Sequence, residues 1–124
     1  EEVVSLTRGS GFRVLNGLEG HFTSALRAGA AGGVLSAANF CPRLCADIYE
    51  KAVAGELDEA EELQGRLNRF MDELDDRFKP WWAVVKTSLS ILGICDNTLT
   101  HPMPTCTDED RKALAGVLRE YDLL

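Results

Sequence analysis

The fold is decided by residues 15–40, LNGLEGHFTSALRAGAAGGVLSAANF, which contain the end of one strand, a helix and a complete second strand. We expect strands at residues 12–15 and 33–37, with a helix at residues 19–28 between them that Gly29 closes. Two strands connected through a helix form a right-handed parallel unit. Both strands stop in small or polar residues, and ligands of open α/β sheets bind at the carboxyl ends of the strands. The stretch therefore predicts an α/β fold with a candidate site at these two ends.

The rest of the chain is predicted to be helical. From Leu57 to Phe78, apolar residues recur every three or four positions with acidic residues between them, which is typical of a long amphipathic helix. Pro42 suits the first turn of another helix, and Thr107 with Asp110 resembles a capping box before the last one. We expect helices at residues 1–8, 42–54, 57–78, 82–92 and 108–121.

This inventory has too few strands for a parallel sheet. Two parallel strands alone leave both outer edges unpaired, whereas parallel sheets are normally wide and covered on both faces. Either the helices wrap the pair unusually, or further strands come from outside these residues. We expect Val14 or Leu35 to contact such strands, and a two-stranded sheet with dry, covered edges would contradict this expectation.

Composition narrows the class of protein. The chain has 124 residues, 45% of them hydrophobic and 27% charged, which suits one modest globular domain. The net charge of −7 argues against a nucleic-acid partner, because phosphate contacts require clusters of Lys and Arg. No apolar run approaches the roughly 18 residues that a membrane span needs, so we expect no membrane association.

The four cysteines allow two interpretations. Cys41 and Cys45 are four residues apart and would share a helix face, but a metal site needs two more ligands at suitable spacing. No second pair is visible beside Cys95 and Cys106, so we expect no metal. Buried reduced thiols are the better interpretation, and they are typical of a cytoplasmic protein, which is the localisation we expect.

A string of short motifs resembles one known family. The motifs are Leu15-Asn16-Gly17, AGAAGGVLSAAN at residues 28–39, Ala54-Gly55-Glu56 with Ala60 following, Lys86 seven residues before Gly93, and Pro102-Met103 before the last helix. In order and spacing they resemble the dihydrodipicolinate synthase / N-acetylneuraminate lyase family of (β/α)8 TIM barrels with extra C-terminal helices. The resemblance implies the C-terminal part of such a barrel: residues 1–41 would be its last two βα units, with strands seven and eight. Residues 42–124 would be the final barrel helix and the C-terminal helical appendage.

The resemblance also implies an activity that these residues cannot complete alone. Members are class I aldolases or lyases that bind pyruvate or another 2-oxo acid as a Schiff base on a lysine, without a further cofactor. In the family this lysine ends strand six, upstream of Glu1, so we expect no catalytic residue in this chain and no activity from it alone. The implied partners are the 2-oxo acid, the remainder of the barrel and further copies in a dimer or tetramer. The four lysines present lie in or beside predicted helices and are interpreted as structural or solvated: Lys51, Lys79, Lys86 and Lys112.

Four residues match substrate-binding positions of the family. Gly17 matches a glycine that leaves room for substrate, and its alternative role is a turn with unusual backbone angles. Leu35 matches an aliphatic residue that lines the pyruvate pocket, and it also suits core packing. Glu19 and Ser36 match positions that bind sugar-acid hydroxyls in sialic-acid lyases. The alternatives are a first-turn acid favoured by the helix dipole for Glu19 and a local strand-end hydrogen bond for Ser36.

Two departures from the family pattern leave the subfamily open, and the acceptor aldehyde stays open because the residues expected to select it lie mostly upstream. Members usually carry Asn-Pro-x-Pro shortly before the matched Lys86, where this chain has only Pro80 and then residues 81–85, WWAVV. Members also often have an arginine before Pro102-Met103, where this chain has Thr100-His101. A second hypothesis from another class also stays open. The chain would be a non-catalytic fragment or degenerate paralogue that binds a partner chain through its strand edges.

Overall fold

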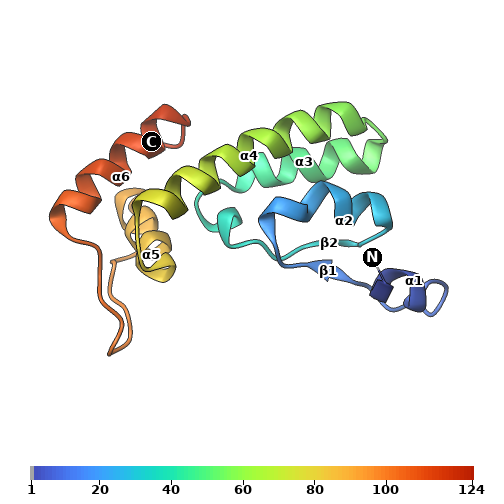
Figure 1. Ribbon diagram of the computed structural model, residues 1–124, viewed down its shortest axis with the longest axis horizontal. Coiled ribbons are helices and arrows are strands. Elements are labelled where there is room, and N and C mark those ends of the chain that lie inside the picture. Colours follow the sequence, from blue (N-terminus) through green and yellow to red (C-terminus); the bar gives the residue numbers. More distant parts are fainter. Residues whose placement is uncertain (1) are drawn as a thin grey trace. The chain divides into compact units, whose positions relative to one another are not determined.

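The computed structural model describes residues 2–124, which divide into two compact units. The first unit comprises residues 2–38 and 42–68, and the second comprises residues 39–41 and 69–124. The chain is mostly helical, and its elements follow one another in the predicted order (Figure 1). Only Glu1 of the predicted first helix lies outside the described residues.

The first unit holds a short parallel sheet. Strands β1 (Leu15–Asn16) and β2 (Gly32–Gly33) pair in parallel, with Leu15 opposite Gly32. Two further hydrogen bonds flank this pair: the Ala31 N–H donates to the Val14 carbonyl, and the Val34 N–H donates to the Asn16 carbonyl, both at 2.8 Å. The parallel arrangement is as predicted.

The predicted strand bounds, 12–15 and 33–37, are wrong. Strand structure persists only where a neighbour supplies hydrogen bonds, and each strand here has one neighbour over two residues. Beyond β2 the chain coils into a 3-10 turn, η2 (Ser36–Asn39), instead of continuing as a strand.

The helices of the first unit lie where they are predicted, but the helix predicted at residues 19–28 begins as a 3-10 turn, and the one predicted at residues 1–8 ends at Thr7. They are α1 (Glu2–Thr7), the 3-10 turn η1 (Glu19–His21), α2 (Phe22–Ala28), α3 (Pro42–Ala54) and the first part of α4 (Leu57–Arg77). Helix α2 ends at Gly29, whose φ of 105° is left-handed and suits glycine at a helix C-terminus. Figure 1 shows α2 and α3 on the same side of the two strands.

Uncovered apolar side chains lie in β1 and just after each of the two strands. Leu15 is 54% exposed and Val34 is 69% exposed, and Leu18 is also exposed. Leu35, in contrast, is already buried by this chain, and Val14 is half-buried. Leu35 is therefore closed to further strands, whereas Val14 keeps some open surface, so a contact between Val14 and further strands stays a prediction. The two strands do not form a sheet with covered edges.

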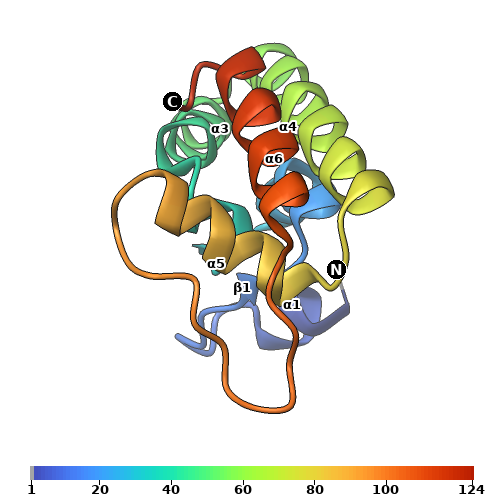
Figure 2. The ribbon, with the colours of Figure 1, turned by 90° about the vertical axis from the view of Figure 1, so that its left-hand side faces the viewer.

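The second unit is built from helices. It contains the last part of α4, α5 (Trp81–Ile91) and α6 (Asp108–Glu120). Helices α5 and α6 lie side by side, and the loop that joins them extends away from both (Figure 2). The predicted capping box is confirmed, since Thr107 Oγ1 accepts from the Asp110 N–H and the Asp110 carboxylate accepts from the Thr107 N–H, both at 3.1 Å.

The cysteines follow the prediction in part. Cys41 and Cys45 are buried, as expected, whereas Cys106 is half-buried and Cys95 is exposed. The prediction is wrong for Cys95 because this residue follows Gly93, where the chain leaves α5 for the exposed loop. Within residues 2–124, no group of three or more His, Cys, Asp or Glu side chains is placed to hold a metal ion.

Measured by length and hydropathy, no helix in residues 2–124 qualifies as a membrane span.

Candidate functional site

The ends of the two strands are joined by one carboxylate. Glu19 follows β1, and Ser36 and Ala37 follow β2. The Ser36 hydroxyl donates to Glu19 Oε1 at 2.7 Å, and the Ala37 N–H donates to the same oxygen at 3.0 Å. The structure thus brings together two of the four predicted site residues, at the end of the sheet where the sequence places the site.

Glu19 is buried, but neighbouring groups donate the hydrogen bonds that a buried carboxylate needs. Burial of the carboxyl raises the pKa of Glu19, and hydrogen bonds from the Ala37 N–H and the Ser36 hydroxyl lower it by more. The pKa therefore lies below its ordinary value of 4.5. A carboxylate held in this way is ionised at neutral pH, and its charge stabilises the two strand ends.

We expect this interaction to make stability depend on pH. Because the pKa of Glu19 is lower in the folded chain than in the unfolded chain, its contribution is present above about pH 4.5 and is lost as the pH falls through the folded pKa. Urea unfolding of the natural chain and of Glu19→Gln from pH 7 to pH 3 isolates this residue. The difference in free energy of unfolding should shrink below about pH 4.5; a difference that stays constant contradicts the assignment.

Gly17 opens onto empty space. No heavy atom lies within 4 Å of the position that a Cβ on Gly17 would take. The alternative of unusual backbone angles is wrong, because Gly17 is not among the glycines with positive φ. The turn is held instead by Asn16, whose Oδ1 accepts from the Leu18 N–H at 3.0 Å. The open space suits a position that leaves room for a ligand.

Leu35 packs in the core, which is the second of the two roles expected for it. Its side chain is buried, and its Cγ would lie 3.2 Å from a Cβ placed on Gly33. Core packing and a place in a pocket wall are compatible for such a residue.

Sequence reasoning missed Gln64. This residue of α4 is only 5% exposed, and its side-chain amide donates to the Glu19 carbonyl at 2.9 Å. A signal was present, because Gln64 occupies a position of the buried face between Ala60 and Leu67, where a polar residue is out of pattern. A buried polar side chain must find partners, and those of Gln64 lie beside the candidate site.

None of the four lysines follows a strand along the chain. Lys51 in α3 contacts Glu56 and Glu59, and Lys79 contacts Asp75 at 2.5 Å in the segment between α4 and α5. Lys86 in α5 donates to Cys95 Sγ at 3.9 Å, and Lys112 lies exposed in α6. That none of them forms a Schiff base stays a prediction.

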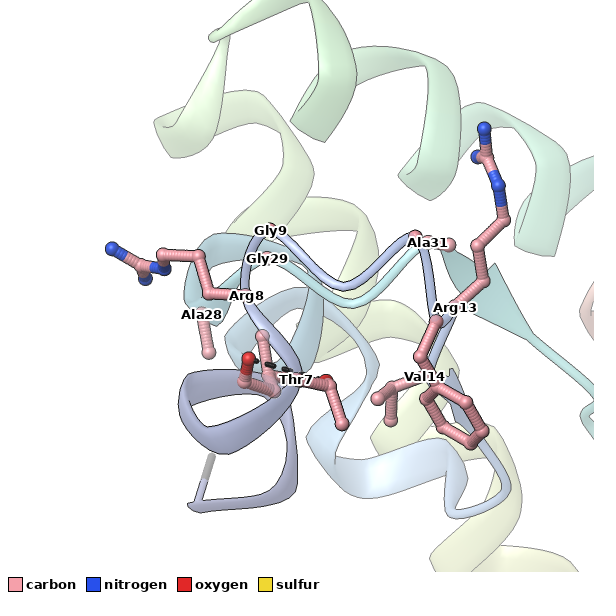
Figure 3. A pocket seen from close by; sticks show the side chains of 11 residues that line it. Thr7, Arg8, Gly9, Arg13, Val14, Ala28, Gly29 and Ala31 are labelled. Atoms are coloured by element: carbon pink, nitrogen blue, oxygen red, sulfur yellow. Dashed lines mark hydrogen bonds between the residues drawn. The ribbon is translucent and has the colours of Figure 1, made fainter.

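A separate cavity lies at the opposite ends of the strands. It has a volume of about 400 Å3 and is lined by α1, the turn at residues 8–13 and the end of α2. Figure 3 shows that the guanidinium groups of Arg8 and Arg13 point away from it. Because ligands of parallel α/β sheets bind at the carboxyl ends of the strands, this cavity at the amino ends is not the candidate site.

Comparisons with known proteins agree on one family. Residues 2–121 match the model of the Dihydrodipicolinate synthetase family. A 4-hydroxy-tetrahydrodipicolinate synthase from Gluconobacter oxydans is 33% identical over 113 residues, covering 91% of this chain and 37% of that protein. The crystal structure of dihydrodipicolinate synthase from Thermotoga maritima superposes with a TM-score of 0.83 at 28% identity, covering 98% of this chain and 41% of the other.

A more distant structure shows the same fold. A prophage protein of the dihydrodipicolinic acid synthase family from E. coli K12, solved in complex with pyruvate, superposes with a TM-score of 0.79 at 19% identity. The superposition covers 93% of this chain and 39% of the prophage protein. The chain therefore spans about two-fifths of the length of the relatives and structures that it matches.

Proposed function

Because this chain belongs to the dihydrodipicolinate synthetase family, we propose that it forms the C-terminal part of a (β/α)8 barrel enzyme, with β1 and β2 as strands seven and eight. Residues 1–41 would supply the last two βα units, and residues 42–124 the final barrel helix and the helical appendage. The exposed Leu15, Leu18 and Val34 support this assignment, since neighbouring strands would cover them. The complete enzyme would be a dimer or tetramer.

The proposed activity is that of a lyase or aldolase of 2-oxo acids. A lysine from the remainder of the barrel attacks the ketone carbon of pyruvate or a related acid, and water leaves as the imine forms. The imine draws electrons from the neighbouring carbon, which loses a proton or a carbonyl fragment and so gives an enamine. The enamine carbon then bonds to an aldehyde or takes up a proton, and water releases the product from the lysine. The pyruvate bound by the E. coli relative supports this substrate class.

The contribution of this chain would be one side of the substrate pocket. Barrel enzymes bind substrates at the carboxyl ends of their strands, and the observation that carries the proposal is the Glu19 carboxylate that joins two such ends through Ser36 and Ala37. Gly17 would leave space for the substrate and Leu35 would form an apolar wall. Ser36 and Glu19 would present a hydroxyl and a carboxylate to a polar substrate tail.

Borohydride trapping tests the activity. In a chimaera, this chain replaces the segment of the Gluconobacter oxydans synthase that aligns with it, and the synthase supplies the remainder of the barrel. Incubation with pyruvate and sodium borohydride should give a covalent pyruvate adduct on a lysine of the synthase portion, detected by peptide mass spectrometry. The isolated 124-residue chain, treated in the same way, should give none on Lys51, Lys79, Lys86 or Lys112.

Two outcomes would contradict the proposal. An adduct on a lysine of the isolated chain would place the Schiff base within it. A chimaera that folds, judged by circular dichroism, but traps no pyruvate would favour the degenerate paralogue. That second hypothesis draws on the same exposed strand residues as a surface for a partner chain. The unmodified synthase serves as the control for trapping.

A further inference from the structure

The side-chain amide of Gln64 uses its full hydrogen-bonding capacity around η1 and the start of α2. Its Nε2 donates to the Glu19 carbonyl at 2.9 Å and to Asn68 Oδ1 at 2.8 Å. Its Oε1 accepts from the Thr23 N–H at 2.9 Å and from Thr23 Oγ1 at 3.1 Å. Rotating the amide by 180° would set oxygen against oxygen and donor against donor, so these partners fix its orientation.

Gln64 also replaces a missing helix cap. The first N–H groups of a helix have no partner within the helix and are usually satisfied by the side chain of the N-cap residue. The N-cap of α2 is His21, which makes no such bond, and the N–H of Thr23 in the first turn is bonded to Gln64 instead. A residue of α4 thus fixes the start of the helix that follows β1.

These contacts connect α4 to the candidate site. Gln64 holds the main chain of Glu19, while the side chain of Glu19 holds the Ser36 hydroxyl and the Ala37 N–H. We infer that Gln64 is a positioning residue: through its bond to the Glu19 carbonyl it places the Glu19 carboxylate, and through that carboxylate it sets the distance between the two strand ends. The meaning of this role for catalysis rests on the proposed function.

The inference is tested with Gln64→Met, which keeps the length of the side chain but removes its donors and its acceptor. Carbon-detected NMR on the 124-residue chain measures the pKa of Glu19, and hydrogen exchange measures the protection of the Ala37 amide. We expect the pKa of Glu19 to rise, because the carboxylate stays buried but loses well-placed donors. We also expect the Ala37 amide to exchange about tenfold faster than in the natural chain.

A matched control lies one turn away on the same two helices. Arg27 of α2 and Glu61 of α4 form an ion pair at 3.0 Å in which both side chains are half-exposed. The double variant Arg27→Gln/Glu61→Gln removes this α2–α4 contact without a change in net charge. The double variant should change neither the pKa of Glu19 nor the exchange rate of the Ala37 amide. The inference attributes both effects to the hydrogen bonds of Gln64 and not to a general loosening of the contact between α2 and α4.

The outcomes separate this inference from the proposed function. An unchanged pKa of Glu19 and unchanged Ala37 exchange in a folded Gln64→Met chain would overturn the role of Gln64, whatever the chimaera does. If Gln64→Met does not fold, Asn68→Ala decides, since it removes one anchor of the amide and should shift both readouts in the same direction by less. No shift in Asn68→Ala would equally overturn the inference. Failure of pyruvate trapping would leave these measurements intact.

Discussion

Replacing Phe70 by alanine is expected to lower the free energy of unfolding by about 3–5 kcal/mol, which is the usual cost of deleting a buried aromatic ring. Phe70 is fully buried in α4. Its ring lies edge-on to Phe40, with 5.8 Å between the ring centroids, and tilted against Tyr121 at 4.6 Å. One ring therefore joins α4 to residues before α3 and after α6, and its removal leaves a cavity that neither neighbour can fill without moving.

Urea unfolding followed by circular dichroism measures this loss. The control is Trp82→Ala, a larger aromatic deletion in the same unit at a side chain that is 56% exposed, for which we expect about 1 kcal/mol or less. Similar losses for the two variants would show that burial of Phe70 does not organise the second unit. A lower slope of the denaturant dependence in Phe70→Ala would point to a loosened native state instead.

Local patterns were sufficient to predict the helices. The period of apolar residues in α4 places Phe70 and Leu74 on the buried face, and both are buried. The ends of α2 and α3 follow from Gly29 and Gly55, whose left-handed φ angles only glycine adopts readily. The capping box at Thr107 is likewise a signal contained within four residues. Each of these features depends on neighbours along the chain, which the sequence displays directly.

The strands and the site depend on partners that are distant in sequence. Residues 12–13 and 35–37 were predicted as parts of strands, yet they do not pair, because pairing requires a neighbouring strand that these residues lack. The candidate residues Glu19 and Ser36 were selected through the family resemblance, but their mutual hydrogen bond spans 17 positions. Gln64 reaches Glu19 across 45 positions, and no local pattern indicates which turn a buried glutamine will bind.

Gly33 decides how closely α2 approaches the sheet, and Gly33→Ala is expected to destabilise the chain by about 3 kcal/mol, the upper part of the range for overpacking. A Cβ at this position would lie 2.7 Å from Cε2 and 3.1 Å from Cδ2 of the Phe22 ring, and 3.2 Å from Cγ of Leu35. Phe22 and Leu35 are both buried, so neither can rotate into solvent. Helix α2 must shift, and with it η1 and the Glu19 carboxylate. Urea unfolding measures the loss in stability.

A rescue variant separates this contact from a general intolerance of β2 to alanine. Phe22→Leu removes the ring atom nearest to the new Cβ, so Gly33→Ala should cost less in the Phe22→Leu background than in the natural chain. Gly17→Ala is the matched control, because a Cβ there meets no atom within 4 Å, and it should change stability by less than about 0.5 kcal/mol. If the two alanine substitutions cost the same, or if Phe22→Leu brings no relief, the close approach of α2 to Gly33 does not set the geometry of the strand ends.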